Sequence, residues 1–411
     1  MTPTPRLQSL DTVRGVAVMG ILLLNIIGFA MPDAAYFNPR AYGGSEGVDL
    51  AVYLANFILF DGKMRGLFSF LFGASLLLVV ERAEAKGEDP LQVHASRMAW
   101  LLVFGLAHLW LIWFGDILGL YALIGMAAFL FRNLPTSRMV ILGVMLVLAQ
   151  TVIFASLPGG VYHFQQVAPG TPQYAEAARQ LAAMDSTFGV PSAADLAKTL
   201  ARFRGDYAGI LADRFAHNSM GPLLMTMLYG AETLAYMLFG MAALRSGLLR
   251  GEWPRARLRM LAWIGFGIGI PAYTAIAIYM LNQDFSTLSV TLGVILLATP
   301  VRPFLILAWA CLILLLARPG GALTTRIAAA GRMAFTNYLG TSLICTTLFY
   351  GYGLGWFGHL SRAELYLVVA AIWGLMVLWS KPWLDHFQYG PLEWLWRSLA
   401  RSSVQPMRRE Y

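Results

Sequence analysis

The stretch VRGVAVMGILLLNIIGFAM, residues 13–31, decides the fold class, because only one arginine and one asparagine interrupt its apolar character. A helix of about 20 apolar residues, rising about 1.5 Å per residue, crosses the hydrocarbon core of a bilayer. The whole chain has the same bias, with 58% hydrophobic residues, 13% charged residues and a mean hydropathy of +0.61. Lipid offers the backbone no hydrogen-bond partners, so such runs must be helical. We therefore predict an all-α, polytopic membrane protein.

Ten apolar runs are long enough, or nearly long enough, to cross a bilayer. They are residues 13–31, 48–80, 99–115, 117–131, 139–157, 221–243, 260–281, 288–316, 333–350 and 365–379. Two of them are expected to be broken helices, one at Asp61-Gly-Lys-Met-Arg-Gly66 and one at Pro300-Val-Arg-Pro303. Ten crossings would place both ends of the chain on one side of the membrane.

The polar stretch between the fifth and sixth runs is the largest predicted region outside the membrane. Its apolar residues recur at helical spacing over residues 193–215, and a second helical pattern covers residues 174–184. The apolar face of the longer helix is expected to lie on the membrane surface or to cover a cavity as a lid. The predicted regions are an amino-terminal membrane bundle (1–157), an outer helical loop (158–220), a carboxy-terminal membrane bundle (221–381) and a cytoplasmic, amphipathic, basic tail (382–411).

The positive charges favour one orientation in the membrane. Of the 30 Lys and Arg residues, 20 fall on the side that holds both chain ends, and only Arg40 and Arg362 lie in short loops on the other side. Short cytoplasmic loops are enriched in Lys and Arg. Both termini are therefore predicted to be cytoplasmic, and the net charge of +8 is explained by topology rather than by nucleic-acid binding.

The two cysteines, Cys311 and Cys345, both fall in apolar runs. Buried cysteines of this kind usually pack as small hydrophobic residues. The chain has no Cys/His spacing typical of a metal site, no phosphate-binding loop and no nucleophile elbow. We expect no bound metal and no tightly bound cofactor.

Charged residues also occur in the outer half of the predicted spans. They are Asp61, Lys63, Arg65, Asp116, Glu232 and Arg302. Charges at bilayer depth are costly, so they either serve function or neutralise one another. Because helix interruptions are tolerated where they line a cavity, all of these except Asp116 are predicted to form a buried charged pocket. Glu232 is interpreted either as an unpaired carboxyl for proton transfer or as the partner of Arg65 or Arg302.

His108 is the only histidine inside a predicted span, and Asp116 is expected about 12 Å further along the same helix. Histidine is the side chain best suited to move a proton near neutral pH. His108 and Asp116 are therefore the candidate catalytic residues. The alternative is a hydrogen-bonded packing histidine among the neighbouring aromatic side chains.

The first span carries a second candidate group. Asp11 precedes Arg14 by three residues, and Asn25 returns to the same helix face as Arg14 eleven residues later. These residues could be a capping pair and an interhelical hydrogen bond, with Gly15 and Gly20 allowing close packing.

The motif Leu10-Asp-x-x-Arg-Gly-x-Ala17 resembles the opening signature of the transmembrane acyltransferase superfamily. More closely, the whole chain resembles the YeiB-like family of bacterial inner-membrane proteins. The motifs that carry this likeness are Arg14-Gly15, Leu67-Phe-Ser-Phe-Leu-Phe-Gly73, Gly105-Leu-Ala-His108, Gly115-Asp-Ile-Leu118 and Gly331-Arg-Met-Ala-x-Thr-Asn-Tyr338. Arg332 and Asn337 in the last motif are expected to form a polar stripe.

The superfamily resemblance implies transfer of an acyl group from cytoplasmic acyl-CoA, as co-substrate, to a small-molecule or glycan acceptor on the outer side. In the polysaccharide acyltransferases a histidine usually stands eleven residues after the arginine, where this chain has Asn25. The base must then come from elsewhere, which again favours His108 with Asp116. Arg14 is expected to contact the phosphates of the donor.

Two other functions fit the sequence. The broken helices and buried charges also fit a transporter of a small charged solute, and a non-catalytic envelope protein is the third alternative. The similar segments 70–74 and 238–242 are interpreted as a parallel duplication or as small residues at helix crossings. Glycine-rich spans would permit a homodimer.

Overall fold

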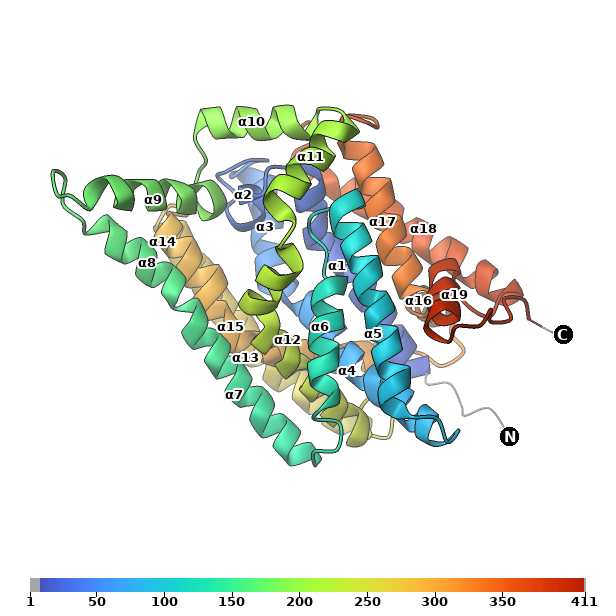
Figure 1. Cartoon of the computed structure of the whole chain (residues 1–411). Helices are drawn as coiled ribbons and strands as arrows, with labels where there is room; N and C mark the ends of the chain where they lie inside the picture. Colours follow the sequence, from blue (N-terminus) through green and yellow to red (C-terminus); the bar gives the residue numbers. More distant parts are fainter. Residues whose placement is uncertain (1–7, 410–411) are drawn as a thin grey trace.

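The computed structural model describes residues 8–409 (Figure 1), and the regular elements of this range are all helices. An isolated bridge between Phe387 and Arg408 is the single β-type pairing recorded within it. The all-α prediction is confirmed. The membrane helices pack side by side, while α9 and α10 lie across one end of them.

The first half contains α1 (Gln8–Ala30), α2 (Ala34–Phe37), α3 (Gly47–Leu59), α4 (Lys63–Glu84), α5 (Pro90–Ala107), the π-helix η1 (His108–Ile112), α6 (Leu118–Phe129) and α7 (Thr136–Phe154). The outer loop contains α8 (Ser156–Gln165), α9 (Tyr174–Phe188), α10 (Ala193–Phe203) and α11 (Tyr207–Asn218). The second half contains α12 (Gly221–Arg245), α13 (Arg255–Asn282), α14 (Thr287–Val290), the π-helix η2 (Thr291–Leu297), α15 (Ala298–Leu316), α16 (Ala322–Arg332), α17 (Ala334–Phe349), α18 (Leu365–His386) and α19 (Pro391–Ala400).

Within the described residues, eight helical segments are long and apolar enough to cross a membrane. The other two predicted spans correspond to α6, which has 12 residues, and to α17, which has 16. The chain is thus a polytopic membrane protein. The prediction of ten crossings depends on these two shorter helices.

The connecting segments gather at two opposite ends of the bundle. At one end the start of α1 meets the α12–α13 connection, where Ser9 Oγ donates to Leu249 O at 2.8 Å. We call this end the terminal side, because the segment after α19 also lies there. At the other end, called here the opposite side, Arg204 Nε donates to Phe357 O at 2.8 Å. The helices therefore run between two sets of loops, as the hydropathy pattern predicts.

The first predicted helix break lies between α3 and α4. Gly62 has φ +68° and precedes α4 directly. A Cβ at this position would collide with the guanidinium group of Arg302, and positive φ also disfavours other residues. The interruption thus places Gly62 against Arg302.

The predicted second break was wrong in its position. Helix α15 runs through both Pro300 and Pro303, and the irregular segment is η2, which precedes α15. Pro300 has no N–H to donate, and it lies directly after the wider turns of η2. Thr299 Oγ1 donates to Ile295 O at 2.7 Å and so satisfies one carbonyl of the wide π-helical turn.

The outer loop also departs from prediction, because the single helix expected over residues 193–215 is divided into α10 and α11. Asp206 is the N-cap of α11, and its side chain accepts a hydrogen bond from Gly209 N at 2.8 Å. Phe203 at the end of α10 stacks on Phe357, with ring centroids 4.6 Å apart. Tyr207 donates to Leu111 O at 2.9 Å. Both helices therefore cover the opposite side of the protein.

Close helix packing joins the first helix to the second half of the chain. A Cβ at Gly15 would collide with Ile327 O of α16, and a Cβ at Gly331 would collide with Asp11 O. The motif at the start of α1 thus lies directly against the motif at the end of α16. Cys311 and Cys345 are both buried and unbridged, as expected.

Candidate functional site

His108 and Asp116 form a direct hydrogen bond. Helix α5 passes into η1 at His108, and the chain leaves the helix at Trp113, which has φ −153° and ψ 133°. The chain then bends at Phe114, so that His108 Nδ1 lies 2.8 Å from Asp116 Oδ1. The expectation that Asp116 lies about 12 Å further along the same helix was wrong, because the helix ends before Asp116.

The environment of Asp116 indicates which nitrogen of His108 carries the proton. Asp116 Oδ2 accepts a hydrogen bond from Gly119 N at 2.8 Å, in the first turn of α6. A carboxylate in this position is favoured by the helix dipole and acts as an acceptor at both oxygens. We therefore assign the proton to Nδ1 of His108, which leaves the lone pair on Nε2.

His108 Nε2 faces the protein interior. His108 is 1% exposed, and its Nε2 has no hydrogen-bond partner among the described residues. The ring of Tyr338 on α17 lies 5.3 Å from the imidazole, measured between ring centroids. On another side Trp113 lies 6.3 Å away and stacks on Phe29 of α1. The unpaired nitrogen thus lies where α1, η1 and α17 meet.

The candidate residues of α1 lie nearer the terminal side. Arg14 Nη1 lies 3.0 Å from Asp11 Oδ1, and Nη2 donates to Ser75 Oγ of α4 at 2.9 Å. Asn25 is half-buried, and no side-chain hydrogen bond is recorded for it within residues 8–409, so the interhelical bond considered for it is not formed. Trp113 Nε1 contacts Gly28 O at 3.4 Å. Gly28 is 14 residues beyond Arg14, so Arg14 and the His108 region are about 20 Å apart along α1.

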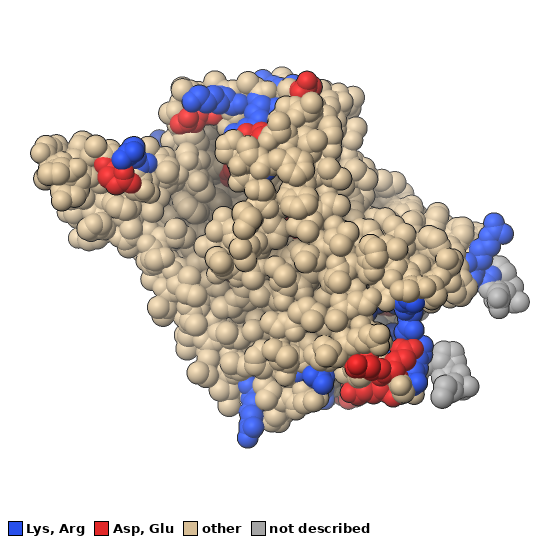
Figure 2. All heavy atoms as spheres, in the orientation of Figure 1, with Lys and Arg blue, Asp and Glu red and all other residues tan. Residues whose placement is uncertain are grey.

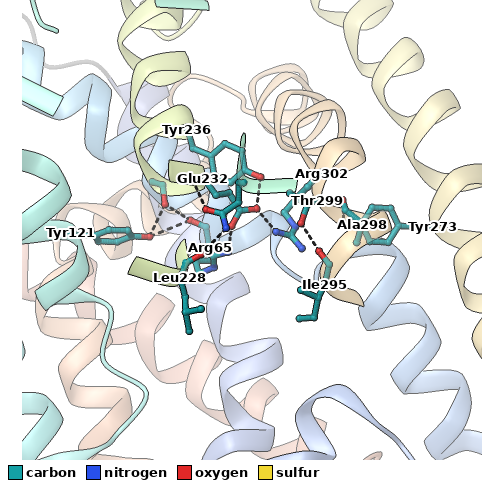
Figure 3. Close-up of polar contacts among 12 residues, drawn as sticks. Arg65, Tyr121, Leu228, Glu232, Tyr236, Tyr273, Ile295, Ala298, Thr299 and Arg302 are labelled. Atoms are coloured by element: carbon teal, nitrogen blue, oxygen red, sulfur yellow. Dashed lines mark hydrogen bonds and ion pairs between the residues drawn. The ribbon is translucent and has the colours of Figure 1, made fainter. Parts of the chain in front are cut away.

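The predicted charged pocket centres on Glu232 of α12, which is fully buried (Figure 3). Arg65 Nη2 lies 2.6 Å from Glu232 Oε2, and Arg302 pairs with Oε1. Tyr236 also donates to Oε1, at 2.7 Å. We call Arg65, Glu232 and Arg302 the charged triad. Glu232 pairs with both arginines at once, so its interpretation as an unpaired proton carrier was wrong.

Gln150 of α7 supports the triad, although sequence reasoning missed it. Its amide donates to Leu228 O at 2.7 Å and accepts from Glu232 N at 3.2 Å. The side chain thereby bridges two backbone groups that are one helical turn apart in α12. A single buried amide in the apolar run 139–157 was the available signal.

Lys63 and Asp61 lie beside the triad. Lys63 is fully buried, and its Nζ donates to Phe57 O at 2.5 Å and lies 3.2 Å from the centre of the Tyr273 ring. The aromatic face and the carbonyl together stabilise the ammonium group. Asp61 lines a narrow pocket on the opposite side together with Tyr36, and burial raises the pKa of Tyr36.

Arg332 and Asn337 do not form one stripe. Asn337 donates to Ala330 O at 3.0 Å and accepts from Trp379 Nε1 at 3.0 Å, which ties α17 to α18. Arg332 instead lines a cleft on the terminal side, which Asp11 also lines and which has a volume of about 200 Å³. The two residues thus lie in different environments.

Comparison with known proteins identifies the family. The chain is 34% identical to the protein named "Uncharacterized protein YeiB" from Escherichia coli K12, over 97% of each chain. It belongs to the YeiB-like family. A second relative, "Uncharacterized protein YxaH" from Bacillus subtilis, is 32% identical over 98% of this chain and 96% of its own. Residues 243–403 also match the family described as "Protein of unknown function (DUF418)". The YeiB-like relatives match the membrane bundles and the outer loop together.

Proposed function

We propose that this YeiB-like protein is a membrane acyltransferase in which His108 is the general base. The observation that carries the proposal is the buried His108–Asp116 pair with Nε2 unpaired. A histidine whose other nitrogen is held by a carboxylate is the arrangement that activates hydroxyl groups in acyl transfer. Arg14 and its surrounding motif add the superfamily resemblance as support.

In the proposed reaction, His108 Nε2 removes the proton of an acceptor hydroxyl while the acceptor oxygen attacks the thioester carbonyl. The tetrahedral intermediate collapses with cleavage of the carbon–sulfur bond, and the proton on His108 passes to the departing thiolate. The products are an acyl ester and free coenzyme A. Because His108 is 1% exposed, turnover also requires η1 or α17 to move and admit the acceptor.

The proposed orientation places both termini in the cytoplasm of a bacterium and the protein in its inner membrane, as the Lys and Arg distribution favours. The donor is then cytoplasmic acyl-CoA, with Arg14 contacting its phosphates, and the acceptor is a small molecule or glycan from the outer side. The separation of about 20 Å between Arg14 and the His108 region suits a donor with a long, flexible arm.

Thermal stabilisation of the purified protein by acetyl-CoA and longer acyl-CoAs tests donor binding. A ligand present at 100 times its Kd should stabilise the fold by about 2.7 kcal/mol. We expect Arg14→Ala to remove this stabilisation and Arg40→Ala, a change on the opposite side, to retain it. The absence of any shift with all acyl-CoAs would contradict the proposal.

A transporter of a small charged solute is the second candidate, favoured by the charged triad beside the break between α3 and α4. It predicts solute uptake into vesicles that is lost in Glu232→Gln and is unaffected by acyl-CoA. Uptake with these properties, together with no release of coenzyme A, would favour the transporter over the enzyme.

A further inference from the structure

Helices α4 and α12 share a sequence pattern around the charged triad. Residues 65–77 and 232–244 align without gaps. The identical pairs are Leu67 and Leu234, Leu71 and Leu238, Phe72 and Phe239, Gly73 and Gly240, and Leu77 and Leu244. The similarity noted above for a shorter segment therefore extends along more than three helical turns.

The two helices also pack against each other as equivalents. A Cβ at Gly73 would collide with Met237 O, and a Cβ at Gly240 would collide with Phe70 O. In each case the contacted carbonyl lies three residues before the glycine of the other helix. Small residues explain the close approach, but a local twofold relation also explains why the contacts are reciprocal.

Two further pairs of helix contacts follow the same relation. If α4, α5 and α6 correspond to α12, α13 and α15, then the packing of α5 on α6 corresponds to that of α13 on α15. In the same way, the contact of α6 with α12 corresponds to the contact of α15 with α4. Parallel repeats related by an axis along the membrane normal occur in transporters, whose ligand sites lie at the repeat interface. The interface between α4 and α12 is therefore a place to seek a ligand site.

The charged triad lies at this interface. Arg65 and Glu232 each precede the glycine of their own helix by eight residues, and they pair with each other. Glu232 is shared with Arg302, so one carboxylate faces two guanidinium groups. The triad therefore carries one excess positive charge, and the same formal excess remains when the neighbouring Asp61 and Lys63 are counted. An uncompensated charge at this depth is costly.

Arg65 is the member of the triad with capacity for another partner. Its side chain is 23% exposed, whereas those of Arg302 and Glu232 are 6% and 0% exposed. Its Nη1 atom is buried and has no partner among the described residues, while Nη2 is bound to Glu232. A guanidinium group presents several donors in a fixed plane and can bind a second oxyanion.

Arg65 has a partly exposed side chain beside the aromatic ring of Tyr229. Its guanidinium group lies 5.0 Å from the centre of the Tyr229 ring, and Tyr36 of α2 is half-buried. Asp33, three residues before Tyr36, is exposed. Figure 2 shows the surface hollowed between α9 and α11, below α10.

We propose that Arg65 binds an oxyanion, a phosphate or carboxylate group, that enters from the opposite side and neutralises the charged triad at the interface of the two repeats. The anion accepts hydrogen bonds from the free donors of Arg65, while Glu232 keeps Arg65 and Arg302 in place. The inference goes beyond acyl transfer and does not depend on it, because it concerns anion binding alone.

Anion binding is measured with the full-length protein in phosphatidylcholine nanodiscs, from the rise in melting temperature with inorganic phosphate or acetate. Chloride keeps the ionic strength constant. We expect Arg65→Gln to lower the affinity for the stabilising anion at least tenfold, and Arg65→Lys to lower it less. The loss of a charge-assisted hydrogen bond of about 1.5–3 kcal/mol corresponds to a decrease in affinity of about tenfold or more. Arg40→Gln, at an exposed arginine on the same side, should bind as the wild type does.

A second arm identifies the source of the oxyanion. Nanodiscs that contain phosphatidylglycerol should stabilise the wild type, but not Arg65→Gln, if a lipid headgroup supplies the phosphate. Stabilisation by free phosphate or acetate alone would identify a soluble ligand. Because Arg302 and Tyr236 still hold Glu232 in Arg65→Gln, this variant should remain folded. An unchanged response in Arg65→Gln, or no response of the wild type to any of these anions, would overturn the proposal.

Discussion

The charged triad and the His108–Asp116 pair are both buried, but they differ in how fully their polar atoms are satisfied. Both oxygens of Glu232 are bound by arginines, and Tyr236 adds a further donor. His108, in contrast, keeps one nitrogen without a partner in the described residues. A satisfied carboxylate holds helices together, whereas an unpaired base at a helix junction is available for chemistry. On the basis of this difference, we propose a structural role for Glu232 and a role in the reaction for His108.

Removing the charge of Glu232 should produce the largest loss of stability. Glu232→Gln leaves two guanidinium groups without a counterion, and breaking a buried pair in this way costs about 3–5 kcal/mol. Denaturant unfolding in detergent measures the change, with the exposed Glu176→Gln as the control. A loss of stability no larger than that of the control would contradict the structural role of Glu232.

His108→Gln should destabilise the protein less than Glu232→Gln. The substitution removes one hydrogen bond to Asp116, for which we expect a loss of about 1–3 kcal/mol. Unfolding under the same conditions tests this order. If His108→Gln destabilised the fold as much as Glu232→Gln, His108 would belong to the architecture as well.

Gln150→Leu sharpens the comparison, since Gln150 joins α7 to α12 beside the triad. We expect a loss of only about 1 kcal/mol, because the two backbone groups are one helical turn apart and can satisfy each other as an ordinary helical hydrogen bond. The same unfolding measurement applies, with Gln180→Leu on the exposed surface of α9 as the control. A gain in stability would show that Gln150 does not support α12.

The smallest effect should come from Asp33, outside the membrane spans. Asp33 keeps part of its surface exposed, but the dense protein around its carboxyl still weakens the solvation of the charged form and raises its pKa from 3.8 to about 6. The native state thus binds the proton more tightly than the unfolded state, so stability should fall as the pH rises from about 4 to about 6. Melting temperatures across this range should depend less on pH in Asp33→Asn. If Asp33→Asn had the same dependence of melting temperature on pH as the wild type, Asp33 would not be the cause of that dependence.

The sequence predicts features that depend on local spacing or on the membrane. Lipid requires long apolar helices, and this identifies most of the spans, while the pairing of Asp11 with Arg14 follows from the helical repeat. The contact of His108 with Asp116 was predicted as a functional association but not in its geometry, because the chain leaves the helix at Trp113. The joint pairing of Arg65 and Arg302 with Glu232 depends on packing between distant segments, which hydropathy does not specify.

The most direct test of the central claim is the release of free coenzyme A from acyl-CoA by His108→Gln, compared with the wild type in the presence of a mixed envelope-glycan extract. Our account predicts that the wild type releases coenzyme A with concurrent acylation of the extract. His108→Gln should bind acyl-CoA equally well and turn over about 10²–10⁴-fold more slowly. Acyl transfer at the wild-type rate by a folded His108→Gln protein would contradict the assignment of His108 as the base.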